Sequence, residues 1–124
     1  MRVWICLAVV AAACGGKPDC KTAISDGVGA MIEHARTTMP ANAIANVERI
    51  APEMTRVLTQ ACVDDHWAQP VIDCIAKSHS QADLNACDKQ LTKDQRDSEH
   101  KRTDEVLKFA MMPHPPAAAG SAAP

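Results

Sequence analysis

Four cysteines, Cys20, Cys62, Cys74 and Cys87, constrain the fold of this chain more than any other feature of the sequence. An even number of cysteines in a small exported domain indicates a framework of disulfide bonds. The chain needs such crosslinks because Trp67 and Phe109 are its only aromatic residues beyond the first few positions. Small aliphatic side chains must build most of the core, and each buries little surface.

The first 14 residues predict export. Arg2 precedes the short apolar run of residues 3–10, and three alanines then lead to Cys14 and Gly15. This pattern is typical of a secretory signal peptide with a small-residue cleavage site. The run is shorter than the roughly 20 apolar residues of a membrane-spanning helix. A cysteine directly after the cleavage site resembles a bacterial lipoprotein signal, which implies that the thiol of Cys14 is acylated. We expect residues 1–13 to be the signal peptide and residues 14–18 a lipidated tether.

The leader could also be an ordinary signal peptide without acylation of Cys14. Ala11 stands where a lipoprotein signal usually carries leucine or another large aliphatic residue. An ordinary signal peptide cut after Ala11 or Ala13 would leave Cys14 as a thiol or a disulfide partner. The other small residues beside the cysteine favour acylation. Gly15 favours the outer membrane, because an aspartate at this position would suggest retention in the inner membrane of some bacteria.

Apolar residues recur at helical spacing from Cys20 onward, and no strand-like alternation is present. A first helix is expected to begin after the N-cap Asp19 and to end at Pro40, because proline disfavours helical conformation in the residue before it. Gly27 and Gly29 within this helix either allow close approach of a neighbouring helix or weaken it. A second helix is expected from about residue 42, with a kink at Pro52.

Three further helices are expected after residue 64. The third carries Pro70 in its first turn, and the fourth and fifth begin at capping-box sequences that start with Ser80 and Thr92. The Pro/Ala-rich residues 113–124 cannot bury a face, and we expect them to be disordered. The predicted fold is all-α, a small disulfide-stapled helical bundle of about four to five helices in residues 19–112.

The spacing of the cysteines favours one pairing without excluding another. Two residues of an antiparallel helical hairpin face each other when they lie equally far from the turn. Cys20 and Cys62 are centred on residue 41, beside the turn at Pro40, and Cys74 and Cys87 are centred on the next hairpin turn, at residues 80–81. This favours the pairs Cys20–Cys62 and Cys74–Cys87. The alternative joins Cys62 to Cys74, symmetrically about residue 68, and leaves Cys20 to reach Cys87.

One segment of the chain combines a run that ends in tryptophan with two spaced cysteines and a capping-box run. These residues are Cys62-Val-Asp-Asp-His-Trp67, then Cys74 and Cys87, and Leu91-Thr-Lys-Asp-Gln95. The segment, about residues 55–96, resembles small cysteine-stapled lipoproteins of high-GC, myxobacterial-type bacteria. The resemblance implies export and helical structure, and it implies no activity. Ala68 and Pro70 depart from the serine and the acidic residue expected after the tryptophan.

Two cysteine–histidine pairs could be interpreted as metal ligands. Cys62 and His66 are separated by four residues, and Cys74 and His79 by five. Zinc or copper accepts such ligands. Thiols in an oxidising compartment pair with one another, however, and the sequence contains no Cys-x-x-Cys. We therefore expect disulfides and helix caps, with no metal and no cofactor.

The remaining polar candidates also favour structural roles. Asp64 and Asp65 could be paired acid–base carboxylates, but an aspartate at the start of a helix is stabilised by the free N–H groups there, which is the role we expect. Trp67 is expected to anchor the core. The fifth helix is densely charged up to residue 105 and apolar at residues 106–112, a stretch that either packs on the bundle, as we expect, or contacts a partner.

Composition limits the classes of function. The formal net charge is −2, and no basic stripe offers a track for phosphates, so no nucleic-acid partner is expected. The sequence predicts a non-enzymatic cell-envelope lipoprotein that faces the periplasm or the cell surface. It would be held to the membrane by its lipid anchor and would serve as an interaction or structural module with a protein partner. The alternative is a redox or metal-handling protein that uses the cysteines and histidines.

Overall fold

The computed structural model describes residues 16–112. The expected signal peptide, Cys14 and the Pro/Ala-rich segment 113–124 therefore lie outside the described residues. The described part contains five helices and no strand. This confirms the prediction of an all-α fold with four to five helices. Its five helices are α1 (Cys20–Thr38), α2 (Ala41–Asp64), α3 (Gln69–Ala76), α4 (Gln81–Asp88) and α5 (Lys93–Met111).

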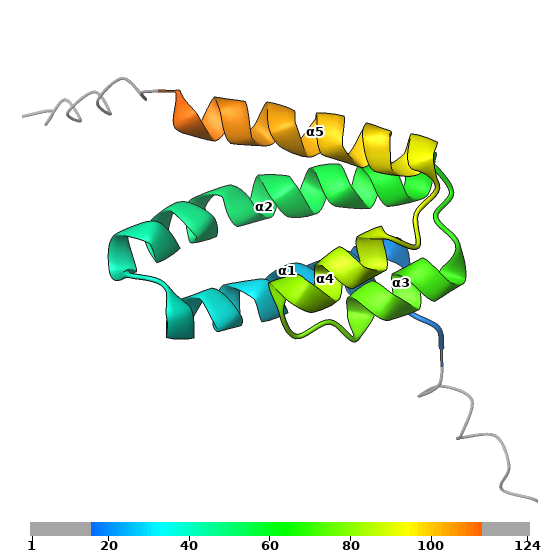
Figure 1. Ribbon diagram of the computed structural model, residues 1–124, viewed down its shortest axis with the longest axis horizontal. Coiled ribbons are helices and arrows are strands. Elements are labelled where there is room, and N and C mark those ends of the chain that lie inside the picture. Colours follow the sequence, from blue (N-terminus) through cyan, green and yellow to red (C-terminus); the bar gives the residue numbers. More distant parts are fainter. Residues whose placement is uncertain (1–15, 113–124) are drawn as a thin grey trace, which may run out of the picture.

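The helices are arranged in three tiers (Figure 1). α5 lies along α2, α2 lies along α1, and the short helices α3 and α4 occupy the same tier as α1. α3 packs against both α1 and α4. The two ends of the described chain lie at opposite ends of the long axis (Figure 1). None of the described helices is long and apolar enough to cross a membrane.

The helices begin where side chains can cap them. Asp19 precedes α1, and its Oδ1 accepts a 2.7 Å hydrogen bond from the backbone N–H of Thr22. This bond lowers the pKa of the Asp19 carboxyl below its ordinary value. Thr92 and Gln95 form the complete capping box that the sequence predicts at the start of α5. Both helix starts are therefore set by local sequence.

The cap of α4 differs from the expected box. Ser80 Oγ accepts from the backbone N–H of Asp83, as predicted. The Asp83 carboxylate, however, accepts from the N–H of His79, one residue before the N-cap, at 2.9 Å. Aspartate stands here in place of the glutamate or glutamine of the usual capping box, and its carboxylate binds the residue before the N-cap in place of the N-cap itself. The hydrogen bond from the His79 N–H is the main cause that lowers the pKa of the Asp83 carboxyl.

Pro52 lies inside α2, and the helix continues across it without a break from Ala41 to Asp64. The expected start near residue 42 is correct to within one residue, with Pro40 at the N-cap position. Pro52 itself is exposed, whereas its neighbour Ala51 is buried. The apolar face of α2 therefore keeps its register on both sides of the proline.

The core is built from small side chains, as the composition requires. Ala61 is fully buried, and the largest fully buried side chains are those of Cys62 and Cys87. Trp67, at 7% exposure, joins the same cluster, which confirms its role as a core anchor. Val106 of α5 is also buried, but most of the apolar end of this helix is not. The expectation that residues 106–112 pack on the bundle is confirmed for Val106, whereas Phe109 is 65% exposed and the methionines that follow it are exposed too.

Candidate functional site

All four cysteines of the described chain are held in disulfides. Cys20 at the start of α1 is joined to Cys62 near the end of α2, with a Cα–Cα distance of 5.9 Å. Cys74 of α3 is joined to Cys87 of α4, with a Cα–Cα distance of 5.7 Å. This is the pairing that the symmetry of the cysteines about the two turns favours. As long as the bonds are intact, these sulfurs offer neither a nucleophile nor a thiolate ligand.

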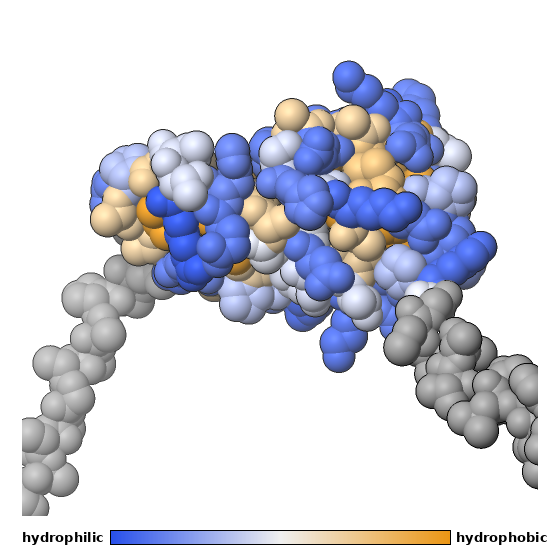
Figure 2. Space-filling view, turned by 90° about the horizontal axis from the view of Figure 1, so that it is seen from below, coloured by the Kyte–Doolittle hydropathy of each residue, from blue (hydrophilic) through white to orange (hydrophobic). Residues whose placement is uncertain are grey.

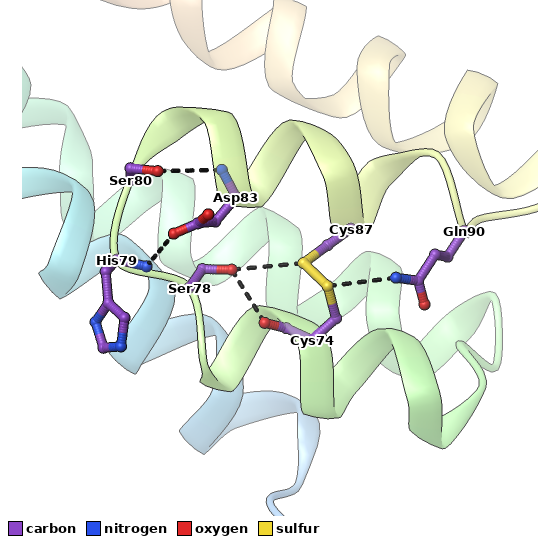
Figure 3. The surroundings of a disulfide bond; sticks show 7 residues. All are labelled: Cys74, Ser78, His79, Ser80, Asp83, Cys87 and Gln90. Carbon is purple, nitrogen blue, oxygen red and sulfur yellow. Dashed lines mark hydrogen bonds between the residues drawn. A yellow bond between two sulfur atoms is a disulfide. The ribbon is translucent and has the colours of Figure 1, made fainter.

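The second disulfide lies in a polar setting (Figure 3). Ser78, only 4% exposed, donates its hydroxyl to the carbonyl of Cys74 at 3.0 Å, and the same oxygen lies 3.4 Å from the Sγ of Cys87. On the other side of the disulfide, Gln90 Nε2 lies 3.4 Å from the Sγ of Cys74. These contacts hold the α3–α4 turn in place, and they present no catalytic group to solvent.

Neither proposed cysteine–histidine pair forms a metal site. His66 adopts φ 51° directly after the C-cap of α2, the left-handed conformation that usually belongs to glycine. Its N–H donates to Val63 O and that of Trp67 donates to Cys62 O, which are the two hydrogen bonds of a Schellman motif. His79 is exposed and bonds to Asp83 through its backbone N–H. Both histidines therefore belong to helix ends.

Asp64 and Asp65 lie where α2 ends, as expected, but the prediction that they stabilise the start of the next helix is wrong. Asp64 is the last residue of α2 and Asp65 its C-cap, whereas α3 begins only at Gln69. Negative charge is unfavourable at this end of a helix. Asp64 accepts hydrogen bonds from Gln60 Nε2 of α2 at 2.7 Å and from Arg102 Nη2 of α5 at 3.2 Å, and the guanidinium offsets its charge. The carboxylate of Asp64 and the backbone carbonyl of Asp65, which accepts from Gln95 Nε2 at 2.9 Å, thus help to hold α5 on α2.

The strongest candidate site is an apolar pocket of about 340 Å³ that is lined by residues of all five helices, with Leu84 and Asp88 of α4 and Glu99, Thr103 and Leu107 of α5 among them. Trp67 lies in its wall, so the core anchor is also a pocket residue. The aliphatic wall comes from Ile24, Val28, Met31, Met54, Leu58, Val71, Ile75, Leu84, Leu91 and Leu107. The polar lining residues are Gln81, Asp88, Glu99 and Thr103.

The charged groups of the pocket are Asp88 of α4 and Glu99 of α5. The Glu99 side chain is only 16% exposed, and burial raises the pKa of its carboxyl above the ordinary value, an effect that His100 partly opposes. His100 Nε2 lies 3.3 Å from Glu99 Oε2 and 3.8 Å from Asp88 Oδ1. Arg96 Nε lies 3.4 Å from the second oxygen of Asp88.

Asp88, Glu99 and His100 are also the described residues whose arrangement could hold a metal ion, since one ligand atom of each lies within 4.8 Å of the others. Arg96 weighs against this use, because its guanidinium already supplies a positive charge to Asp88. Arg96 also donates to the backbone oxygens of Asp88, Lys89 and Leu91, which end α4 and begin the next loop. The main role of this cluster is therefore to connect α4 to α5.

A second groove of about 540 Å³ runs between α2 and α5. Three arginines line it, and each has a partner within the protein. Arg56 pairs with Glu53, Arg102 pairs with Asp64, and Arg49 donates to the carbonyl of Ala110. Arg49 and Arg102 therefore serve mainly to hold α2 and α5 together. The groove is lined by both acidic and basic side chains, whereas the charged residues of the apolar pocket are all acidic.

Neither the pocket nor the role of Glu99 in it is evident from the sequence. Figure 2, seen from the side of α1, α3 and α4, shows a mostly hydrophilic surface interrupted by apolar patches. One signal of the pocket was present, because Glu99, Thr103 and Leu107 recur every four residues and share a face of α5. Comparisons with protein-family models, curated proteins and solved structures gave no match to this chain. The geometry therefore carries the functional argument by itself.

Proposed function

We propose that this protein is an exported, non-enzymatic module of the bacterial cell envelope. It is tethered to a membrane, with the outer membrane favoured, through an acylated Cys14, and it acts by binding. The observation that carries the proposal is the pair of disulfides, which uses every cysteine of residues 16–112. Disulfides persist in oxidising compartments such as the periplasm, and a small core of this kind gains stability from them.

The N-terminal leader supports the proposed membrane tether through Cys14. Ala12 and Ala13 precede Cys14, and Gly15 and Gly16 follow it, as in a lipoprotein signal. The described domain begins only a few residues later, with the N-cap Asp19. A lipid on Cys14 would therefore hold the bundle close to the membrane surface. The domain offers an apolar pocket, and its cysteines are held in disulfides and do not serve as nucleophiles. Both features favour binding over catalysis.

Phase partitioning tests the anchor. The wild-type protein and Cys14→Ser are expressed with the native leader and extracted with a phase-separating detergent. The wild type is expected in the detergent phase, with mass spectrometry showing an acylated N-terminal Cys14, whereas the variant lacks the acyl groups. An unmodified Cys14 in a chain cut after Ala11 or Ala13 would overturn the tether while leaving export intact.

The alternative function, redox or metal handling, receives one observation in its favour, the Asp88–Glu99–His100 arrangement. Thermal unfolding with and without zinc tests it. We expect an unchanged midpoint, because Arg96 competes for Asp88. A clear rise in the midpoint that His100→Ala abolishes would favour metal handling over the binding module.

A further inference from the structure

The apolar pocket is lined as a site for a hydrocarbon chain would be. All but four of its lining residues are apolar, and they come from all five helices and the segments between them. Two methionines, Met31 and Met54, contribute unbranched side chains that adapt to an irregular ligand. Its volume of about 340 Å³ lies within the range of small-molecule sites. A water molecule takes about 30 Å³ of liquid, so the pocket has room for about eleven groups of that size, close to the size of a methylene.

The charge on this wall has a single sign. Asp88 and Glu99 are the charged lining residues, and both are acidic. Arg96 Nε lies 3.4 Å from Asp88 Oδ2. Glu99 is the more buried of the two, and the exposed His100 is the basic residue beside it. Burial, together with the negative charges of Asp88 and Asp104, raises the pKa of the Glu99 carboxyl. A positive group on a ligand would relieve this unfavourable burial of charge.

We propose that this pocket binds a single-chain amphiphile whose head group is a protonated amine or a quaternary ammonium, with the chain among the aliphatic side chains and the head group at Glu99. The charge complementarity at Glu99 selects the head group, and the apolar lining and the volume select one chain of about ten to twelve carbons. The proposal does not depend on the lipid anchor, because its residues all belong to the described bundle.

The test uses the chain from residue 14 onward, exported behind a general secretion leader and carrying Cys14→Ser. This protein keeps all the described residues, and Trp67 is its only tryptophan. Because Trp67 lines the pocket, its fluorescence reports an occupant. Dodecylamine, 1-dodecanol and dodecanoate are titrated below their aggregation concentrations, and calorimetry repeats each titration so that a silent fluorescence signal has an independent check.

We expect dodecylamine to bind at least tenfold more tightly than the alcohol or the carboxylate. Glu99→Gln is expected to weaken the amine about tenfold and to leave the alcohol unchanged. The matched control is Glu105→Gln, on the same helix but lining the other groove, which should change neither. Equal binding of the three ligands, or an amine affinity that Glu99→Gln does not alter, would overturn the proposed head-group specificity.

The length of the ligand's hydrocarbon chain and the location of its binding site are tested separately. Affinity should rise about fourfold for each added methylene from octylamine to dodecylamine, as expected for burial of apolar surface. Thr103→Phe, which projects into the pocket from α5, should abolish binding of all these ligands while circular dichroism shows an intact fold. A folded Thr103→Phe protein that still binds dodecylamine, or the absence of any binding to the unsubstituted chain, would overturn the proposal.

Discussion

Gly27 of α1 lies so close to Ile75 of α3 that a Cβ atom on the glycine would meet Ile75 Cγ2 at 2.9 Å and the Ile75 carbonyl oxygen at 3.3 Å. Of the two roles the sequence allows for the glycines of α1, close approach of a neighbouring helix is therefore the one that Gly27 has. Gly29 has the other, because a Cβ there would meet nothing within 4 Å. The contact seats α3, and with it the disulfide-linked α3–α4 turn, against α1.

The two glycines give opposite predictions. Gly27→Ala should destabilise the domain by about 1–2 kcal/mol, because crowding at Ile75 outweighs the better helix propensity of alanine. Gly29→Ala should stabilise it by up to about 1 kcal/mol, since only the propensity changes. Urea unfolding of both variants beside the wild type measures the difference. Two shifts of the same sign would contradict the close approach of α1 and α3.

The two disulfides are expected to differ in their contribution to stability. Cys20 and Cys62 are 42 residues apart, and Cys74 and Cys87 are 13 apart. In the chain-entropy model the longer loop contributes about 4 kcal/mol and the shorter about 3 kcal/mol. Double replacement by alanine should therefore lower the urea midpoint more for the first pair than for the second. Each pair has one almost completely buried cysteine, Cys62 or Cys87, so loss of packing is expected to be similar in both variants. The reverse order of midpoints would show that strain or residual structure, not loop length, dominates.

The cap of α1 predicts how stability depends on pH. The hydrogen bond from the Thr22 N–H lowers the pKa of Asp19 in the folded state below the ordinary value of 3.8. A lowered pKa means that the carboxylate stabilises the fold above pH 3.8, and that this contribution is lost as the pH falls below it.

Asp19→Asn isolates that charge, because asparagine is an equally good N-cap but does not titrate. Thermal midpoints should show the wild type losing stability relative to Asp19→Asn between pH 5 and pH 2. Asp19→Ala, which removes the cap itself, should be less stable than both proteins at pH 7. Parallel pH profiles for the wild type and Asp19→Asn would rule out a role for the carboxylate charge.

His66 is expected to be a position at which the protein gains stability by substitution. A non-glycine residue in the left-handed region costs about 1 kcal/mol, and His66 occupies that region at the end of α2. His66→Gly should raise the free energy of unfolding by up to about 1 kcal/mol, whereas His79→Gly, before the N-cap of α4, should not. A large loss of stability in His66→Gly would mean that the imidazole makes a contact beyond its role in the Schellman motif.

The sequence predicted the features that depend on neighbours along the chain. The caps at Asp19 and Thr92, the turn at Pro40 and the facing of the cysteines about their turns all follow from local patterns, and the structure has them. The role of Asp64 and Asp65 was misjudged because the next helix starts five residues later than the end of α2, which placed them at a C-terminus.

The candidate site could not be predicted in the same way. Its wall is made by side chains that are distant in sequence, from Ile24 to Leu107, and by the space that they leave unfilled. Periodicity shows that a residue faces inward, but it does not show whether the interior at that place is packed. Glu99 stands in a run of charged residues, and only the tertiary fold distinguishes this half-buried carboxylate from its exposed neighbours.

The fold and the proposed exported module both depend on the four cysteines serving as crosslinks. Peptide mapping without reduction, on protein recovered from its native envelope with free thiols blocked at lysis, measures this. We expect one crosslinked peptide that contains Cys20 and Cys62, a second that contains Cys74 and Cys87, and no blocked thiol at any of the four. Recovery of a Cys62–Cys74 crosslink, or of blocked free thiols at these positions, would contradict the fold's covalent framework and the proposal of an exported binding module built on it.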